Sequence, residues 1–505
     1  MTHTDISLEE WEVLDLLTSL VDKSLVIYEE DEQGLGRYRL METVRQYAGD
    51  KMVEIRQSES LRRRHSRYFL SLAETASPHL MGPQQKQWCD HLEVEHDNLR
   101  LALNWYLTDE TAPMDETAAA RQDEKPNGID GVVEQGALRL VYALHWFWWS
   151  RSYQQEGYES LRCALAHPTA QGRTRWRAHT LFAAAWFANG IAGAPTARAL
   201  HDESMAVAQE VGDIESLAAS SFRLGIIAVQ EGEYTVARSY LERVLELEPT
   251  SGDQTWQTLS RFALGLCASA QGDFKKAHAL LVEAGRMAQE RGYVEGEALA
   301  VIGSGMVAFF AGEDARARTA LEQGLRLLRA HGFRTHQVLA LRYLALLDAM
   351  QDNYPSAYSL IEQAMEMNAD ARENKEHSRN LVPLALIALR QEHYGAARQH
   401  LTQCLPMLQA LEMKFEMLLA LEAWAALEVA NRRWSRATCV YGAAAALRTR
   451  MGALTIFKAH SHYEHSVALC GDALGQESFR LAWETGYAMT IEQVVDYALG
   501  EQEDA

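Results

Sequence analysis

Histidine clusters are the first residues of this 505-residue chain whose types and spacing could do chemistry. His460, His462 and His465 form H-x-H-x-x-H, a pattern that could hold a metal ion. Only His462 and His465 share a helical face and no cysteine joins them, so we favour a polar helix start. The same interpretation applies to a second group, which consists of His91, Glu93, Glu95 and His96. We therefore predict no metal ligands.

Nucleophiles and phosphate-binding loops are the next candidates. The six cysteines are widely scattered without paired spacing, which disfavours a zinc site or a disulfide framework and fits a reducing compartment: Cys89, Cys163, Cys267, Cys404, Cys439 and Cys470. The sequence contains no GxxxxGK[ST] loop that could hold a nucleoside triphosphate. No Ser/His/Asp order or spacing stands out as catalytic. We expect no catalytic residues, no cofactor and no enzymatic activity in this chain.

Charge and hydropathy limit the partners. Arg62, Arg63, Arg64 and Arg67 could contact phosphates, but a net charge of −21 argues against a general nucleic-acid surface. We favour a solvated helix face for these arginines and expect no direct nucleic-acid binding. The apolar stretch 145–149 is too short to span a bilayer, and acidic residues interrupt the N-terminus, so no secretory signal is expected. We predict a cytoplasmic protein without membrane contact.

Small residues recur at a spacing of 40 and reveal the elements that position any site. The first series is Ala197, Ala237, Ala277, Ala317, Ala357, Ala397 and Ala437, preceded by Gly157. Twelve positions earlier stand Ala185, Gly225, Gly265, Gly305, Ala345, Ala385 and Ala425. Four positions after the alanines stand Leu241, Leu281, Leu321, Ile361 and Leu401, with His201 and Tyr441 as the exceptions. A fixed period in this range indicates a solenoid of repeated units.

Each period is predicted to form two antiparallel helices. In the stretch 257–292, the first helix ends at Gly272-Asp273 and the second ends at Gly292. The small residues allow the paired helices to approach closely, and Leu281 is expected to pack against the next pair. Over residues 138–450 the pattern resembles the tetratricopeptide repeat. It is six residues longer than the family's 34-residue unit, so the superhelical pitch does not follow from the resemblance.

The first helix of each pair is expected to line the concave face, with a row that is aromatic at its N-terminal end and charged toward its C-terminal end. Besides Ile226, Leu266, Phe310, Leu386 and Glu422, it contains our predicted binding residues: Tyr142, Trp146, Trp149, Phe182, Trp186, Phe222, Phe262, Met306, Phe309, Arg342 and Arg390. One interpretation is a groove for an apolar peptide, a helix or a small molecule. The alternative is that the rings pack against each other in a tightly coiled superhelix.

The N-terminal hundred residues do not belong to the repeats and form a separate region. The pattern predicts a helix over 9–21, strands over 25–28 and 37–40, and a second helix over 41–55. This order is the end of a winged-helix fold without its opening helices. Two further helices are expected over 60–75 and 84–106, followed by an acidic stretch that lacks helical periodicity.

Five separated motifs extend the resemblance to nearly the whole chain. They are LVDKSLV (20–26), RYRLMETVRQYA (37–48), RRRHSRYFLSLAE (62–74), LEVEHDNLRLALNW (92–105) and GDALGQESFRLAWETGYAMTIEQVVDYAL (471–499). Together they resemble the C-terminal half of bacterial STAND-type signal-transduction ATPases, in which an NB-ARC-type nucleotide-binding domain precedes a winged helix and tetratricopeptide-like repeats. The NB-ARC Met-His-Asp signature corresponds here to Leu40, Met41 and Glu42, so its nucleotide contact is not carried over.

The predicted fold is all-α, a tetratricopeptide-like superhelix with a small partial winged-helix region at its N-terminus. The expected domains are a partial winged helix (1–57), a helical connector (58–107), an acidic linker or insertion (108–136), 40-residue repeats (137–450) and a C-terminal helical cap (451–505). The resemblance implies the sensor and protein-interaction region of a STAND-type regulator. It would bind a protein partner or small effector, with a nucleotide-binding domain acting in trans or on a missing segment. The alternative is a standalone adaptor with no associated ATPase.

Overall fold

The computed structural model describes residues 10–30, 36–54, 58–80, 84–108, 135–247, 254–333, 336–367, 375–453 and 463–500. The chain divides into two compact units, which are described separately. The first contains residues 1–76 and 90–130, and the second contains residues 77–89 and 131–505. Most of the predicted acidic linker, residues 109–134, lies outside the described residues.

The first unit confirms the predicted order of helix, hairpin and helix. Its elements are α1 (Glu10–Asp22), β1 (Val26–Glu30), β2 (Gly36–Leu40), α2 (Glu42–Glu54), α3 (Ser58–Ala76), the end of α4 (Gln85–Val94) and α5 (His96–Thr108). The strands pair antiparallel with Val26 opposite Leu40, and the rings of Tyr28 and Tyr38 lie 5.1 Å apart. Arg37 extends from β2 to donate a hydrogen bond to the Val94 carbonyl (2.9 Å).

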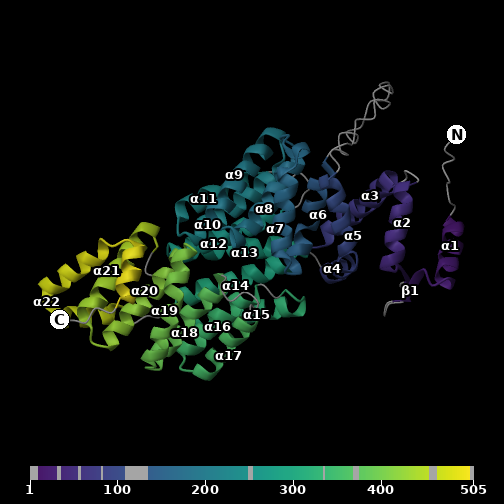
Figure 1. The fold of residues 1–505 in the computed structure, drawn as a ribbon. Coiled ribbons are helices and arrows are strands. Elements are labelled where there is room, and N and C mark those ends of the chain that lie inside the picture. The colour runs from purple at the N-terminus through teal and green to yellow at the C-terminus, as the bar shows by residue number, and fades with distance from the viewer. Residues whose placement is uncertain are drawn as a thin grey trace. The chain divides into compact units, whose positions relative to one another are not determined.

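The second unit begins with the short helix η1 (Ser77–His79) and the start of α4, and continues with eight helix pairs (Figure 1). The pairs are α6 (Gly136–Ser150) and α7 (Gln154–Ala166), α8 (Arg175–Ile191) and α9 (Ala194–Val211), α10 (Ile214–Gln230) and α11 (Tyr234–Glu246), α12 (Thr255–Ala270) and α13 (Phe274–Glu290), α14 (Val294–Phe310) and α15 (Asp314–Ala330), α16 (Gln337–Met350) and α17 (Tyr354–Glu366), α18 (Lys375–Arg390) and α19 (Tyr394–Ala410), and α20 (Lys414–Ala430) and α21 (Trp434–Met451). A short η3 (Pro168–Ala170) follows α7. The second helix of every pair begins 40 residues after the previous one, which confirms the repeat.

The period alanines lie where the paired helices touch. All seven are fully buried. The glycines twelve positions earlier are needed at this contact, because a β-carbon at Gly265 would lie 2.8 Å from the Leu281 side chain, and one at Gly305 would be equally close to Leu321. Leu281 was predicted to pack against the next pair. It contacts both neighbours, since a β-carbon at Gly303 of the next pair would also lie 2.8 Å from it.

The turn inside most pairs requires one residue with left-handed backbone. These residues stand 40 apart from Gly232 onward, with Ser152 two periods before Gly232, and have φ angles of 59–79°: Ser152 (64°), Gly232 (70°), Gly272 (79°), Gly312 (78°), Asp352 (59°), Glu392 (60°) and Arg432 (59°). Glycine adopts this conformation without steric cost, whereas other residues lose about 1–2 kcal/mol. The later repeats therefore keep the turn geometry with unfavourable residues.

Arginines that follow the period alanines connect each pair to the next one. Arg198 forms an ion pair with Glu231, Arg238 contacts Gln271, and Arg398 forms an ion pair with Glu428 (3.1 Å). Glu428 is fully buried and also lies within 4.0 Å of Arg433 and Arg436. Leaving a buried charge without its partner costs about 3–5 kcal/mol, so the contacts of Glu428 stabilise the stacking of the last two pairs.

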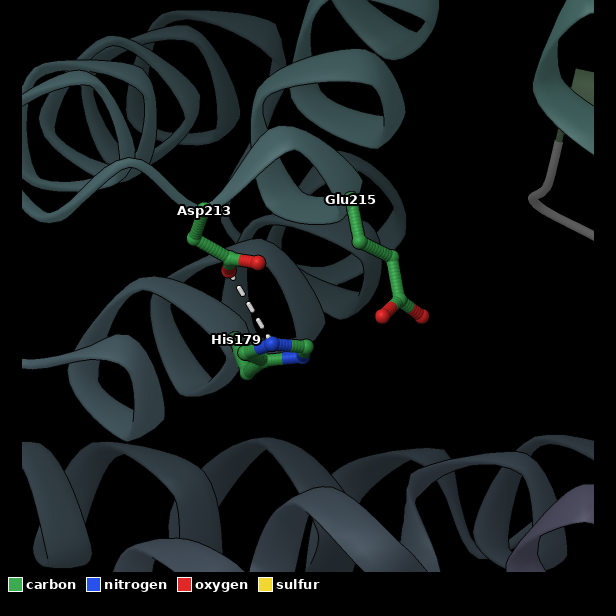
Figure 2. A group of neighbouring side chains, drawn as sticks. All are labelled: His179, Asp213 and Glu215. Carbon is green, nitrogen blue, oxygen red and sulfur yellow. Dashed lines mark ion pairs between the residues drawn. The ribbon is translucent and has the colours of Figure 1, made fainter. Parts of the chain in front are cut away.

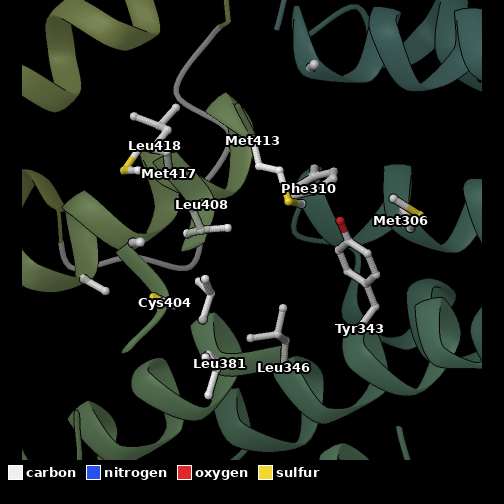
Figure 3. Close-up of a cluster of buried hydrophobic side chains, with 14 of the residues drawn as sticks. Met306, Phe310, Tyr343, Leu346, Leu381, Cys404, Leu408, Met413, Met417 and Leu418 are labelled. Atoms are coloured by element: carbon white, nitrogen blue, oxygen red, sulfur yellow. The ribbon is translucent and has the colours of Figure 1, made fainter. Parts of the chain in front are cut away.

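The repeat region closes on itself through contacts between residues far apart in sequence. A β-carbon at Gly232 would lie 2.7 Å from the Met451 side chain, and Lys414 Nζ lies 3.7 Å from Glu233 Oε1. The rings of Phe310 and Phe415 lie 6.4 Å apart. We call this set the interlayer contact, with Gly232, Glu233 and Phe310 on one side and Lys414, Phe415 and Met451 on the other. In the middle of the superhelix the inward side chains therefore pack against each other, as the second interpretation of the row predicted. Side chains of α14, α16 and α20 share one buried cluster there (Figure 3).

Two helices follow the repeats. α22 (Tyr463–Tyr487), which changes direction at Gly475, packs closely against α21. A β-carbon at Gly486 would overlap the Cys439 carbonyl oxygen, and one at Gly442 would overlap that of Trp483. α23 (Ile491–Leu499) begins with a capping box between Thr490 and Gln493. None of the described helices combines the length and the apolarity needed to cross a bilayer.

Candidate functional site

The inner face of the repeats consists of the first helices of the pairs. Consecutive first helices contact each other, as α8 contacts α10 and α10 contacts α12, which places them on the inside of the curve. Residues 40 apart therefore occupy equivalent places on this face. The predicted row lies here, but its members differ in burial and in what they touch.

The N-terminal part of the inner face is filled by aromatic rings. We call Tyr142, Trp146, Trp149, Phe182, Trp186, Phe222 and Trp256 the aromatic cluster. The ring of Trp186 lies 5.0 Å from Trp146, 5.7 Å from Trp149 and 6.0 Å from Phe182. Trp256 joins the cluster through Phe182 (5.7 Å) and Phe222 (5.6 Å). Trp256 is absent from the predicted row because it stands at the start of α12, before Phe262, the first predicted inward residue of that helix.

The cluster divides into buried and partly accessible rings. Phe182 and Phe222 are 3% and 6% exposed, whereas Trp146, Trp149 and Trp186 are half-buried. Tyr142 is also half-buried, and burial raises the pKa of its hydroxyl above the ordinary value. The packing alternative therefore describes the two phenylalanines, and the tryptophans keep an accessible edge.

The middle of the predicted row belongs to the core. Phe309 is fully buried, and its ring lies 5.4 Å from Tyr343. Met306 is buried in the same cluster, and Phe262 is half-buried beside Gly303. Arg342 is buried as well, because its guanidinium forms an ion pair with Glu376 (2.6 Å) and donates a hydrogen bond to Asn380 (3.1 Å). The side chains of Phe309 and Arg342 therefore make contacts inside the protein.

The C-terminal part of the inner face contains a pocket of about 380 Å³. Its apolar lining comes from α16, α18 and α20: Leu346, Ala349, Met350, Leu386, Leu389, Leu419, Ala423, Ala426 and Ala430. Small side chains at Ala423 and Ala426 leave the space open. Volumes of 300–1,000 Å³ with apolar walls are typical of small-molecule sites, so this pocket is a candidate binding site.

A few polar groups surround this pocket. Arg390, a predicted binding residue, lines it with its Nε donating to the Ala349 carbonyl (3.0 Å) and Nη2 lying 3.7 Å from Asp352. Glu422 is held by an ion pair with Arg448, whose guanidinium lies 5.0 Å from the centre of the Tyr463 ring. The pocket can therefore bind a mainly apolar group and orient it through a small number of fixed charges and hydroxyls.

Of the residues that line the pocket, the predicted row contains only Leu386, Arg390 and Glu422, and three of the others come from outside the first helices and their turns. Tyr441 lies in the wall on α21, and Tyr463 and Ser466 lie there on α22. The rings of Tyr441 and Tyr463 meet edge to face at 5.1 Å. The sequence does distinguish Tyr441, because it is one of the two exceptions to the aliphatic position four residues after the period alanines. Tyr463 and Ser466 had none, since α22 lies outside the period.

His201 is the other exception to the aliphatic position four residues after the period alanines, and it is buried beside the aromatic cluster. It is fully buried, its ring lies 5.9 Å from Phe182, and neither ring nitrogen has a hydrogen-bond partner. Burial, followed by the positive charge of Arg223, lowers the pKa of His201 well below its ordinary value. The imidazole is therefore neutral near pH 7.

His179, Asp213 and Glu215 form a group whose ligand atoms could hold a cation (Figure 2). His179 Nε2 lies 3.0 Å from Asp213 Oδ2, as the dashed line shows. Arg175 already supplies a positive charge here, with distances of 3.5 Å to Asp213 and 3.2 Å to Glu215. Burial would raise the pKa of Asp213, but the hydrogen bond and charge of His179, together with Ser216 and the charge of Arg175, lower it below its ordinary value. We interpret the group as an ion-pair network that joins α8 to the start of α10.

The remaining chemical candidates are separated from each other. His460 and His462 lie outside the described residues, and His465 is exposed on α22. His96 is buried whereas His91 is exposed, so the two do not converge. Arg62, Arg63, Arg64 and Arg67 are exposed on α3. None of the six cysteines, all of which lie within the described ranges, forms a disulfide, and burial raises the pKa of the Cys267 and Cys404 thiols to about 12, which keeps them protonated.

Comparison with known families identifies the two modules. Residues 4–52 match the winged helix-turn-helix domain family, and residues 218–251 match the tetratricopeptide repeat family. Candidate HTH-type transcriptional regulators of Mycobacterium bovis and Mycobacterium tuberculosis are 30% identical over 250 residues. That segment covers 47% of this chain and 26% of each relative, so the match spans about a quarter of the length of the curated relatives.

Solved structures share the repeat fold. A Rap protein crystallised with competence and sporulation factor covers 72% of this chain and 99% of its own length, at 13% identity and a TM-score of 0.51. A STAND protein of Pyrococcus horikoshii with a tetratricopeptide repeat sensor covers 78% of this chain and 61% of its own length, at 12% identity and a TM-score of 0.44. Together with the family matches, the first likeness confirms the predicted all-α fold with a tetratricopeptide-like superhelix and a winged-helix region.

Proposed function

We propose that this chain is the sensor and protein-interaction region of a STAND-type signalling or transcriptional regulator. In this proposal the chain binds and does not catalyse. A protein partner or effector occupies the concave face, and the C-terminal pocket is the part of that face that receives it. The observation that carries the proposal is the pocket of about 380 Å³ between the repeats and α22.

The location of the pocket supports a sensing role. Its floor belongs to α16, α18 and α20, while Tyr463 and Ser466 of α22 form part of its wall. A group that fills the pocket contacts repeats and cap together, so its binding energy depends on how they are placed. Such a ligand shifts the population toward the arrangement that it binds more tightly. The winged-helix region would pass this change to a nucleotide-binding module.

The test is an affinity capture from the native host with the full chain and one substitution that fills the pocket. Ala426→Trp places an indole in the pocket, so we expect capture of the partner or effector to be largely lost. Gln399→Trp adds the same side chain to an exposed position of α19 and should behave like the wild type. Equal capture by both variants would contradict the assignment of the pocket.

The identity of the captured molecule distinguishes the two functional candidates. A co-purifying nucleotide-binding protein supports the split-regulator form of the proposal. Recovery of other proteins without one supports the standalone adaptor. Gel-shift titration of the chain with duplex DNA tests the expected lack of nucleic-acid binding, since salt-sensitive binding would assign a DNA-contacting role to the winged helix.

A further inference from the structure

The charges that line the C-terminal pocket do not balance. Three carboxylates, those of Asp352, Glu392 and Glu422, stand against one cation, Arg390. Arg390 Nη2 lies 3.7 Å from Asp352, and Arg448, which is not part of the lining, forms an ion pair with Glu422. None of the described cations forms an ion pair with Glu392. The pocket therefore keeps one negative charge that no group of the described chain matches.

Two consecutive turns supply the carboxylates at the edge of the pocket. Asp352 and Glu392 occupy the left-handed turn position, with φ angles of 59° and 60°, where three earlier repeats have glycine. A side chain strains the backbone there, whereas glycine does not. Arg432 has the same conformation in the next turn but does not line the pocket. Strained residues that border a cavity suggest that their side chains have a use there.

A tyrosine follows each of these two carboxylates at a distance of two residues. Tyr354 and Tyr394 begin α17 and α19, are half-buried and line the pocket. The Tyr354 hydroxyl donates a hydrogen bond to Asp352 (2.7 Å), which holds the ring beside the carboxylate. A carboxylate followed by a tyrosine stands at this place of the period only in these two repeats. Because the faces of aromatic rings attract cations, this edge of the pocket suits a positive charge.

The rest of the lining suits an apolar body. Leu346 is buried and Leu386 and Leu389 are half-buried, and none of them offers a hydrogen-bonding side chain. Asp352 has 72% of its side chain exposed and Glu392 is exposed as well, so the acidic groups lie at the solvent edge. A ligand that matches this polarity has an apolar part and one positive charge at its end.

We propose that the C-terminal pocket binds a small lipophilic amine in its protonated form. The ammonium group pairs with Glu392 and lies against the rings of Tyr354 and Tyr394, and the apolar body lies against Leu386 and Leu389. A carboxylate and aromatic faces attract the same cation, and their effect is larger where water is partly excluded. This inference rests on the proposed function, because it names the chemical class of the effector that occupies the pocket.

The experiment is calorimetric titration of the full chain at pH 7 with three probes of similar shape and different charge. They are 4-phenylbutylamine, 4-phenylbutan-1-ol and 4-phenylbutanoate. We expect the amine to bind at least about tenfold more tightly than the alcohol, and the acid to bind more weakly than the alcohol. Glu392→Gln keeps the size of the side chain and removes its charge, so it should lower the affinity for the amine to that for the alcohol.

Three variants separate the site from general charge attraction and from folding. Ala426→Trp fills the pocket but keeps the net charge of −21, so it should abolish binding of all three probes if they bind in the pocket. Glu362→Gln removes an exposed carboxylate of α17 outside the lining and should keep the preference for the amine. Glu392→Gly removes a left-handed side chain, so it should lose this preference without loss of stability.

The outcomes distinguish this inference from the proposed function. Equal affinity for amine and alcohol, tighter binding of the acid, no binding of the amine, or amine binding that survives Ala426→Trp would each overturn the inference. Equal affinities that are lost in Ala426→Trp would leave the pocket as the binding site and exclude only the amine. The proposed function fails separately, when Ala426→Trp captures the same molecules from the native host as the wild type.

Discussion

The N-terminal and C-terminal parts of the inner face share one backbone pattern but differ in what fills it. In α6, α8 and α10 the inward positions carry rings that contact each other, as Trp186 contacts Trp146 and Trp149. In α18 and α20 the corresponding positions carry Leu386 and Ala426, and a pocket of about 380 Å³ remains. The repeat thus fixes where side chains point, and their size decides whether the face is packed or hollow.

Charge pairing differs between the same two parts. In the C-terminal part, Arg342 and Arg379 share Glu376, and Arg379 also contacts Glu416 (2.7 Å). In the N-terminal part, Arg223 has no carboxylate partner among the described residues. The first arrangement stabilises the stack through ion pairs, whereas in the second the guanidinium lies over the ring of Trp186. Three predictions follow this comparison, beginning with the largest effect.

Displacing α22 from the repeats should open the C-terminal pocket without disturbing the aromatic cluster. Gly486→Ala places a methyl group against the Cys439 carbonyl, so α22 has to move away from α21. We expect a loss of about 3 kcal/mol in the stability of the cap, at the upper end of overpacking costs. Hydrogen exchange should show faster exchange in α22. Gly471→Ala, where the added carbon meets only the Phe479 side chain at 3.9 Å, is the matched control. Unchanged protection of α22 would contradict this packing.

Acid should weaken the C-terminal part first. Burial would raise the pKa of Glu376, but the charges of Arg379 and Arg342 outweigh it and hold this pKa at about 2. Because the folded pKa is depressed, its contribution to stability is present above about pH 4.5 and is lost as pH falls toward 2. We expect about 2 kcal/mol from this carboxylate after allowance for its partial exposure.

Urea unfolding at pH 5, 4 and 3 measures this contribution. In Glu376→Gln the fall in stability between pH 5 and 3 should be smaller than in the wild type. Glu362→Gln, on α17, serves as the control. If Glu376→Gln and the wild type have parallel pH profiles, the ion pairs around Arg342 and Arg379 do not carry the acid sensitivity.

Substitutions in the turns inside the helix pairs should change the stability of the chain in opposite directions, depending on whether the native residue is glycine. Glu392 has a φ of 60°, so Glu392→Gly relieves a left-handed conformation and should stabilise the chain by about 0.5–1 kcal/mol after the entropy cost of glycine. Gly272→Ala, at a φ of 79°, should destabilise it by about 1 kcal/mol. Thermal unfolding measures both. Stabilisation by Gly272→Ala would show that the turn tolerates a side chain in either part.

The sequence carried the periodic features because they depend on local rules. Spacing alone placed the second helices and the small residues where paired helices touch, and it located the row that includes Trp186 and Arg390. Whether these side chains are packed or exposed depends on the superhelical pitch, which a repeat six residues longer than its family does not reveal. Phe309 and Arg342 are buried for that reason. Tyr441 could have been found as an exception to the period, whereas Tyr463 lies beyond it.

The interlayer contact has a mechanical consequence. A superhelix whose neighbouring turns do not touch can extend gradually. Here Gly232 and Glu233 touch Met451 and Lys414, so the coil is fastened across its own gap. A ligand that widens the interior has to separate these residues, and also the rings of Phe310 and Phe415 and the buried cluster that α14, α16 and α20 share. The spacing between neighbouring turns of the superhelix is therefore set by these side chains as well as by the stacking of the helix pairs.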